Sequence, residues 1–281
     1  MKLVRFGAPG AEKPGIFDSQ GRIRDASGHV PDYAGAGVSA KALEKLRQLD
    51  VENLPMAPEG VRIGAPVGHV RNFIAIGLNY ADHAAEAGLR IPREPVIFNK
   101  LGNCIVGPND NVIMPRDSQK LDYEVELAFV ICKPTRYVAE EDALSHIAGF
   151  CICNDISERH FQIERSGQWC KGKCAETFGP LGPWLVTPDE VDFEALGLWL
   201  DVNGERRQTG STATMIFKIP YMLSYVSQFM VLEPGDVVTT GTPPGVALGM
   251  KEPKWLKAGD VMHLGIDGLG EQEQTVVAFE A

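Results

Sequence analysis

Residues 121–131 constrain the fold of this 281-residue chain more than any other segment. In the first half of the segment, Asp122, Glu124 and Glu126 alternate with apolar residues, and the second half, residues 128–131, is apolar throughout. Alternation places the three acids on one face of a β-strand, and a run that is apolar on both faces is typical of a strand inside a sheet. The segment therefore predicts a central strand with three carboxylates on one face.

The row of carboxylates indicates a bound cation. Acidic side chains two residues apart on a strand lie about 6.6 Å from each other, and each charged pair repels by about 2.5 kcal/mol at an effective dielectric of ~20. Mg²⁺ or Mn²⁺ would offset this repulsion, because both prefer oxygen ligands, whereas Zn²⁺ favours His and Cys. Asp155 directly follows the apolar residues 148–154 and is well placed to add a ligand. The alternative is a solvated strand face whose acids need no ligand.

The whole chain predicts an α+β fold that is mainly β, in two parts. Residues 1–70 form a small N-terminal αβ module of short strands and one helix, residues 41–49, that Ser39 caps. Residues 71–281 form the larger domain, a mixed, largely antiparallel β-sandwich roll with longer apolar strands. Strands are predicted at residues 2–6, 15–18, 22–25, 73–76, 96–98, 121–131, 147–154, 196–202, 236–240, 261–266 and 274–278. Helices are predicted at residues 80–87, 139–145 and 219–229, and Gly/Pro clusters mark turns at residues 107–108, 179–183, 234–235 and 241–245.

The charge of the chain argues against two classes of partner. Asp and Glu (37) outnumber Lys and Arg (27), so the net charge of −10 disfavours nucleic acid and anionic lipid surfaces. No apolar run reaches roughly 18–20 residues and the start has no signal-peptide core, which predicts a cytoplasmic protein without a membrane partner. The six cysteines are expected to be mostly buried thiols, because a reducing compartment excludes a disulfide framework and their spacings are unusual for zinc.

Two further positions are candidates for catalysis. His83 and Glu86 lie three residues apart in a predicted helical turn, where the carboxylate can orient the imidazole as a base that deprotonates water. An ordinary contact on a surface helix is the alternative. Lys173 lies in an irregular Gly- and Cys-rich stretch, where a solvated loop lysine is the default interpretation. The Gly-rich residues 239–245 lack the Gly-Lys-Ser/Thr of a phosphate loop, but their backbone and hydroxyls can hold a small carboxylate.

Four motifs together resemble the fumarylacetoacetate hydrolase family. They are residues 76–83 (IGLNYADH), Glu124-x-Glu126, residues 154–159 (NDISER) and residues 240–243 (TGTP), and the resemblance covers residues 72–278. It implies a mixed β-sandwich roll, usually a homodimer, that holds Mg²⁺ or Mn²⁺. The residues it implies are Glu124, Glu126 and Asp155 for the metal, His83, Glu86 and Lys173 for catalysis, and Arg159, Gln162 and Thr242 for the substrate. The founding hydrolase has a fourth carboxylate ligand with no evident counterpart here, so waters are expected to complete the coordination.

A cation beside a base and a lysine suits a 2,4-dioxo acid as substrate. The expected reaction is hydrolysis of the C3–C4 bond to pyruvate and a second carboxylic acid, because the cation stabilises the enolate of pyruvate. Residues 1–7 and 176–184 look closest to hydrolases of 2,4-diketo-3-deoxy sugar acids. Decarboxylation of oxaloacetate and isomerisation of a 2-hydroxymuconate or heptadiene-dioate are competing reactions on the same scaffold. Two further candidates are a ureidoglycolate lyase, for which no residue here provides a chemical basis, and a 2-oxo acid binding protein.

Overall fold

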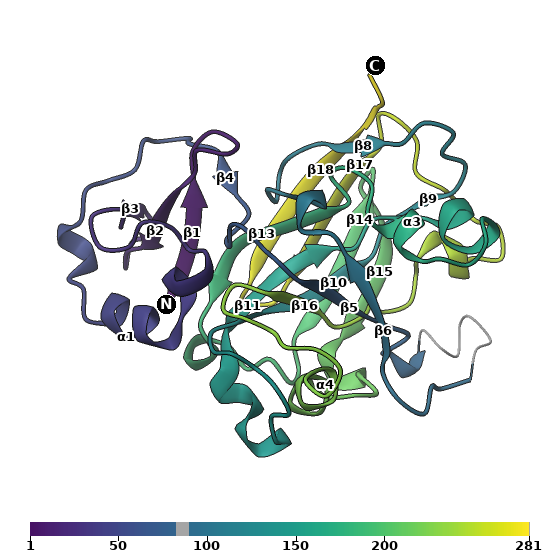
Figure 1. The fold of residues 1–281 in the computed structure, drawn as a ribbon. Coiled ribbons are helices and arrows are strands. Elements are labelled where there is room, and N and C mark those ends of the chain that lie inside the picture. Colours follow the sequence, from purple (N-terminus) through teal and green to yellow (C-terminus); the bar gives the residue numbers. More distant parts are fainter. Residues whose placement is uncertain (83–89, 281) are drawn as a thin grey trace.

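The computed structural model describes residues 1–82 and 90–280, which form two large β-sheets and a two-stranded one, joined by short helices and turns (Figure 1). The larger sheet contains β1 (Lys2–Phe6), β2 (Lys13–Phe17), β3 (Ile23–Asp25), β4 (Ile63–Gly64), β5 (Phe73–Gly77), β6 (Val96–Lys100), β7 (Ile105–Val106), β10 (Val125–Ile131), β11 (Ile147–Asn154), β13 (Gly179–Val186) and β16 (Val237–Thr239). The second sheet contains β8 (Val112–Met114), β14 (Gly197–Val202), β15 (Glu205–Ser211), β17 (Val261–Ile266) and β18 (Gly270–Ala278). Strands β9 (Leu121–Asp122) and β12 (Ser157–Glu158) form a separate pair, and the α-helices are α1 (Ala40–Arg47), α3 (Cys170–Lys173) and α4 (Ile219–Val226).

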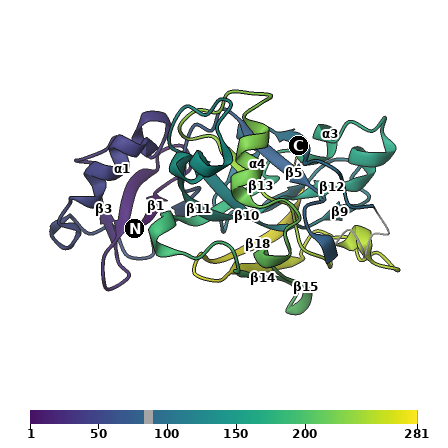
Figure 2. The same cartoon turned by 90° about the horizontal axis from the view of Figure 1, so that it is seen from below.

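The two sheets pack face to face. Strands β10, β11 and β13 of the larger sheet contact β14, β17 and β18 of the second, and every residue of β10 and β11 is buried. Figure 2 shows α4 on the opposite side of β10 from β14, β15 and β18. Helix α4 buries Ile219, Met222, Leu223 and Val226. This arrangement confirms the predicted fold class, a mainly β, mixed sandwich roll.

The order of strands in the larger sheet brings distant parts of the chain together. Strand β10 lies between β11 and β16 and is antiparallel to both. Strand β16 pairs in parallel with β5, which pairs with β6. Strands β5 and β6 therefore lie in the same sheet as β10.

None of the helices in residues 1–82 and 90–280 combines the length and apolarity needed to cross a lipid bilayer.

The N-terminal strands extend the larger sheet. Strand β1 pairs with β13, with Leu3 opposite Leu185, and β2, β3 and β4 continue from there. In Figure 1 these strands and α1 form the purple part beside the main body. Ser39 caps α1 as predicted, because its hydroxyl accepts a hydrogen bond from the N–H of Ala42 (3.3 Å). The division of the chain into residues 1–70 and 71–281 stays a prediction.

The predicted strand 121–131 is interrupted. Strands β9 and β10 are separated by Tyr123 and Glu124, because the N–H groups of Glu124 and Val125 donate to side chains and not to a neighbouring strand. The acceptors are Asn154 Oδ1 (3.1 Å) and Gln208 Oε1 (3.0 Å). Asp122, Glu124 and Glu126 therefore do not lie on one regular strand as predicted. Asp122 belongs to β9, and it does not lie with Glu124 and Glu126.

Three other predictions differ from the structure or lie outside it. The turn predicted at residues 179–183 is part of the buried strand β13, because this segment pairs with β1 and β11 and the Gln272 side chain bonds the Gly182 carbonyl oxygen. The helix predicted at residues 139–145 is a 3₁₀-helix, Glu140–His146, in which Ala143 alone is buried, so too little apolar surface is available to dock a longer α-helix. The helix predicted at residues 80–87 lies mostly outside the described residues.

Candidate metal centre

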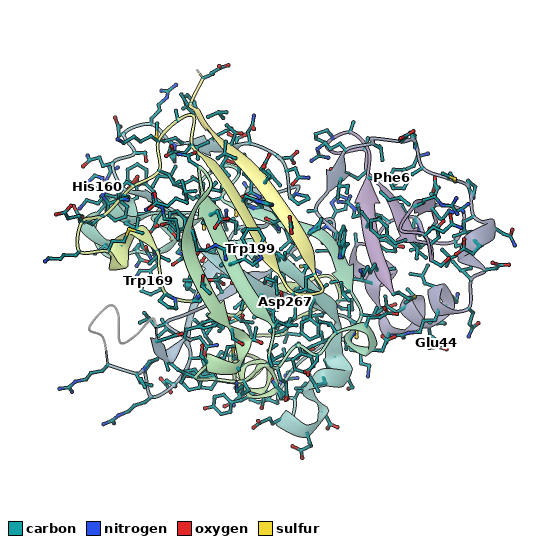
Figure 3. All side chains as sticks on the ribbon, turned by 180° about the vertical axis from the view of Figure 1, so that it is seen from behind. Phe6, Glu44, His160, Trp169, Trp199 and Asp267 are labelled. Carbon is teal, nitrogen blue, oxygen red and sulfur yellow. The ribbon has the colours of Figure 1, made fainter. Side chains whose placement is uncertain are left out.

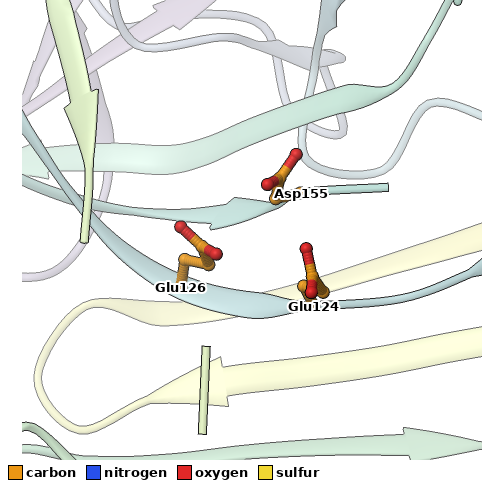
Figure 4. Close-up of side chains that lie close together, drawn as sticks. All are labelled: Glu124, Glu126 and Asp155. Carbon is orange, nitrogen blue, oxygen red and sulfur yellow. The ribbon is translucent and has the colours of Figure 1, made fainter. Parts of the chain in front are cut away.

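Three acidic side chains converge at one end of the β10–β11 pair. Glu124 directly precedes β10, Glu126 is its second residue, and Asp155 directly follows β11. Figure 4 shows the three carboxylates close together, and one oxygen from each lies within 4.8 Å of the others. The strand register produces this geometry, because Glu126 is paired with Cys153 and the N–H of Asp155 donates to the Glu124 carbonyl oxygen (2.8 Å). All three side chains are buried.

Two buried lysines neutralise part of this acidic charge. The Lys173 ammonium, at the end of α3, donates to Glu124 and to Asp155 Oδ2 (2.6 Å). The Lys100 ammonium, at the end of β6, lies 2.6 Å from Asp155 Oδ1 and donates to the Lys173 carbonyl oxygen (2.6 Å). Lys100 thus links Asp155 to the backbone that carries Lys173, and both lysines are almost completely shielded from solvent.

Arg159 holds the other side of the acidic group. Its guanidinium donates to Glu124 Oε1 (2.6 Å), Asp122 Oδ2 (2.9 Å) and Gln162 Oε1 (3.0 Å). Asp122 also accepts hydrogen bonds from the backbone N–H groups of Ala247 (2.8 Å) and Leu248 (3.1 Å). Asp122 therefore orients Arg159 and a loop, and it lies outside the group formed by Glu124, Glu126 and Asp155.

Glu126 differs electrostatically from Glu124. Burial alone raises the pKa of Glu124, but Arg159 and Lys173 outweigh it and hold this pKa below its usual range. Burial, together with Asp155 and Glu124, raises the pKa of Glu126 well above its usual range. Among the residues that the structure describes, Glu126 accepts the N–H of Gly241 (3.0 Å) and forms no ion pair with a Lys or Arg. A set of oxygen donors that includes a carboxylate without a cation fits Mg²⁺ or Mn²⁺.

The acidic group lies at the floor of a cavity of about 180 Å³. Seven of the residues that the sequence singled out line this cavity: Glu124, Glu126, Asp155, Arg159, Gln162, Lys173 and Thr242. The Thr242 hydroxyl is already engaged, because it donates to the Val125 carbonyl oxygen (2.9 Å) and accepts from Gln208 Nε2 (2.8 Å). His83 and Glu86 lie outside the described residues, so the predicted dyad stays a prediction.

Several residues near the site were not predicted from the sequence, among them Lys100, Phe98 and Trp169. Lys100 contacts Asp155, while Phe98 and Trp169 line the cavity. The only local signal for Lys100 is a single lysine at the end of an apolar strand. No local pattern marks either ring: the pairing of β5 with β6 sets the neighbours of Phe98, and Trp169 directly precedes the short helix α3.

The fold and the acidic group together define a β-roll protein with a candidate site for a divalent cation. Residues 72–277 match the family described as Fumarylacetoacetate (FAA) hydrolase C-terminal, and the chain belongs to this family of enzymes, as its motifs predicted. A protein of Burkholderia multivorans is 57% identical over 276 residues, which cover 98% of each chain. Its name is that of a hydrolase and states no substrate.

Solved structures share the fold over the whole chain. The fumarylacetoacetate hydrolase from psychrophilic Exiguobacterium antarcticum is 38% identical, with a TM-score of 0.89 over 99% of this chain and 100% of its own. Maleylpyruvate hydrolase from Sphingobium sp. SYK-6, in complex with manganese(II) and pyruvate, is 28% identical, with a TM-score of 0.83 over 100% of both chains. The 2-hydroxyhepta-2,4-diene-1,7-dioate isomerase from Mycobacterium marinum is 29% identical, with a TM-score of 0.79 over 100% of both chains. The scaffold thus carries both hydrolases and isomerases.

Proposed function

We propose that this chain is a metal-dependent hydrolase that cleaves the C3–C4 bond of a 2,4-dioxo acid of the acylpyruvate type. The observation that carries the proposal is the buried group of Glu124, Glu126 and Asp155 at the floor of a cavity that Lys173 and Arg159 also line. The Mn²⁺ and pyruvate named for the Sphingobium structure are a metal and a product of the proposed kind. We further propose a cytoplasmic homodimer, as the family resemblance and the composition suggest.

Glu124, Glu126 and Asp155 would hold Mg²⁺ or Mn²⁺. Bound there, the ion supplies Lewis-acid polarisation to a 2-oxo acid, typically worth several kcal/mol. These three residues would therefore determine where the 2-oxo acid end of the substrate binds, and the 4-oxo group would lie next to Lys173 and Gln162, which line the same cavity.

Two neighbouring side chains would stabilise negative charge at the 4-oxo group. Lys173 has three N–H donors, of which two are directed at Glu124 and Asp155, so one can serve the substrate. Arg159 holds Gln162 Oε1, which leaves the N–H₂ group of this amide to donate to a ligand. These donors make Lys173 and Gln162 the proposed oxyanion-stabilising pair.

The proposed base is His83, oriented by Glu86. It would take a proton from a water whose oxygen then bonds to C4. The C3–C4 bond breaks, its electron pair stays on C3, and C3 takes up a proton. One water is consumed, and the products are pyruvate and the carboxylic acid derived from the acyl group.

Pyruvate formation from a panel of 2,4-dioxo acids tests this proposal. We expect turnover that is lost after chelator treatment and restored by Mn²⁺ or Mg²⁺. In the His83→Ala variant we expect loss of most turnover with unchanged Mn²⁺ affinity, because His83 is not a proposed ligand. Full activity in chelator-treated protein, or the absence of pyruvate from every substrate of the panel, would refute the hydrolase assignment.

Isomerisation of a 2-hydroxy-diene-dioate is the second candidate. The likeness to the Mycobacterium marinum isomerase over the whole chain favours it. This reaction needs no attacking water, so the two functions differ in their dependence on the base. An isomerase would convert the diene-dioate without releasing pyruvate, and its activity would survive the His83→Ala substitution.

A further inference from the structure

The cavity above the acidic floor has a wall of apolar side chains. We call these residues the apolar wall: Ile76, Leu78, Phe98, Ile163, Trp169 and Leu248. Ile163 and Leu248 are 50% and 44% exposed, although large aliphatic side chains are usually buried. The wall therefore offers apolar surface that a bound molecule can cover.

Phe98 and Trp169 connect the floor to the wall. The Lys173 ammonium lies 5.1 Å from the centroid of the Phe98 ring, and the Trp169 ring packs edge-on against Phe98 with centroids 5.2 Å apart. Gly77 leaves room for the indole, since a Cβ at this position would lie 2.9 Å from the Trp169 ring. In space, the Phe98 ring lies next to the ion-paired ammonium of Lys173, and the Trp169 ring packs on the Phe98 ring.

The two cations that line the cavity, Arg159 and Lys173, are both paired with carboxylates at its floor. Arg159 donates through Nε, Nη1 and Nη2 to three acceptors, and Lys173 is bound to two carboxylates. Among the described residues that line the cavity, no further Lys, Arg or His is present. The Thr242 hydroxyl is committed to Val125 and Gln208. A carboxylate or a row of hydroxyls on the acyl group would therefore lose water without gaining a partner on this wall, which is costly.

We infer that the acyl group of the substrate is apolar, an alkyl or aryl chain that packs on Phe98 and Trp169. This inference rests on the proposed function and narrows it to acylpyruvates with an uncharged, unhydroxylated tail. It departs from the sugar-acid substrate that the sequence resemblance suggested, because a sugar-acid tail carries hydroxyl groups.

Matched substrates test the inference. Hexanoylpyruvate and succinylpyruvate both extend beyond acetylpyruvate, the first with an alkyl tail and the second with a carboxylate. Each fully buried methylene group raises the binding affinity by a factor of about four, and a methylene that is only partly covered by the wall raises it by less. We expect kcat/KM for hexanoylpyruvate to exceed that for succinylpyruvate by at least about tenfold. Equal values, or a preference for succinylpyruvate, would overturn the inference.

Variants of Trp169 assign the selectivity to the wall. In Trp169→Ala we expect the ratio of kcat/KM for hexanoylpyruvate to that for acetylpyruvate to fall several-fold. In Trp169→Arg we expect the ratio of kcat/KM for succinylpyruvate to that for hexanoylpyruvate to rise. Trp199→Ala is the matched control, because Trp199 lies on β14 of the second sheet, away from Trp169 (Figure 3). Its substrate ratios should equal those of the wild type. Unchanged ratios in both Trp169 variants would show that the wall does not bind the tail.

A binding measurement separates this inference from the hydrolase proposal. We expect the Mn²⁺-loaded protein to bind 2-oxohexanoate at least about tenfold more tightly than 2-oxoadipate in isothermal titration calorimetry. This comparison requires no turnover, so it tests the wall even if no 2,4-dioxo acid releases pyruvate. Tighter or equal binding of 2-oxoadipate would contradict the inference while leaving a hydrolase of acidic acylpyruvates possible.

Discussion

At the scale of single residues, Glu126 is the acid whose surroundings differ most from those of an acid that serves only the structure. Glu124 and Asp155 each contact a lysine, and these contacts alone could account for their burial. Glu126 is buried against two other carboxylates and accepts the backbone N–H of Gly241. Structural acids in this chain are paired differently, as Asp122 is with Arg159. The proposed Mg²⁺ or Mn²⁺ would supply the positive charge that Glu126 does not receive from a lysine or arginine among the described residues.

The Glu126→Gln variant tests this interpretation. We expect the affinity for Mn²⁺ to fall by at least about tenfold, because a neutral amide replaces a charged ligand. The metal-free protein should keep its free energy of unfolding or gain slightly, because a repulsive carboxylate is removed. Titration calorimetry with Mn²⁺ and urea unfolding in chelator measure the two quantities. Glu273→Gln, at an exposed position of β18, is the control. Wild-type Mn²⁺ affinity in Glu126→Gln would exclude Glu126 as a ligand.

The strand pattern included Asp122 among the converging acids, and only the family resemblance named the set Glu124, Glu126 and Asp155; neither predicted which cations these acids contact. Glu124 and Glu126 are close because they are two residues apart, and Asp155 joins them because β10 and β11 are neighbours along the chain and in the sheet. Lys100 reaches Asp155 only because β16 lies between β10 and β5. No pattern within a single segment encodes that strand order.

At the scale of elements, β13 shows where local patterns mislead. Its sequence, GPLGPWLV, contains two glycines and two prolines and predicts a turn, yet it lies between β1 and β11 in the larger sheet. The Gln272 side chain donates to the carbonyl oxygens of Gly182 (2.9 Å) and Ile152 (3.0 Å), replacing hydrogen bonds that the irregular pairing omits. Strands β11 and β17, which are mostly apolar and contain no proline, have the bounds that the sequence predicted.

Packing requires a glycine at the start of β13. A Cβ on Gly179 would lie 2.9 Å from the Phe73 ring and 3.3 Å from Cys104 Sγ, and both neighbours are buried. We therefore expect Gly179→Ala to lower the free energy of unfolding by about 1–3 kcal/mol, as measured by urea denaturation. Gly28→Ala is the matched control, because no atom lies within 4 Å of its Cβ position, and its effect should stay within about 0.5 kcal/mol. Equal stability of the two variants would show that β13 adapts to the added methyl group.

At the scale of the whole molecule, an ion-paired cluster joins the N-terminal strands to the main body. Arg62 donates to Asp110 Oδ1 (2.8 Å) beyond β7, and to Glu12 Oε1 (3.0 Å) and the Gly7 carbonyl oxygen (3.1 Å) next to β1 and β2. Asp110 also accepts the N–H of Gly107 (2.7 Å). The Arg62 side chain is 27% exposed and that of Asp110 is 25% exposed, so water screens this pair only in part. Together with the β1–β13 pairing, the cluster connects the N-terminal strands to the rest of the larger sheet.

The Asp110→Asn variant tests this coupling through its dependence on pH. Burial alone raises the pKa of Asp110, but Arg62 and the Gly107 N–H outweigh it and hold this pKa below its usual range. A carboxyl whose pKa is lower in the folded state stabilises the protein above its unfolded-state pKa, and this stabilisation is lost as the pH falls through the folded-state pKa. We expect Asp110→Asn to cost about 1–2 kcal/mol at pH 7 and less near pH 3, measured as the difference from wild type in urea unfolding. Glu252→Gln, at an exposed position, should show no such trend. A cost for Asp110→Asn that is the same at both pH values would mean that the charge of Asp110 does not stabilise this cluster.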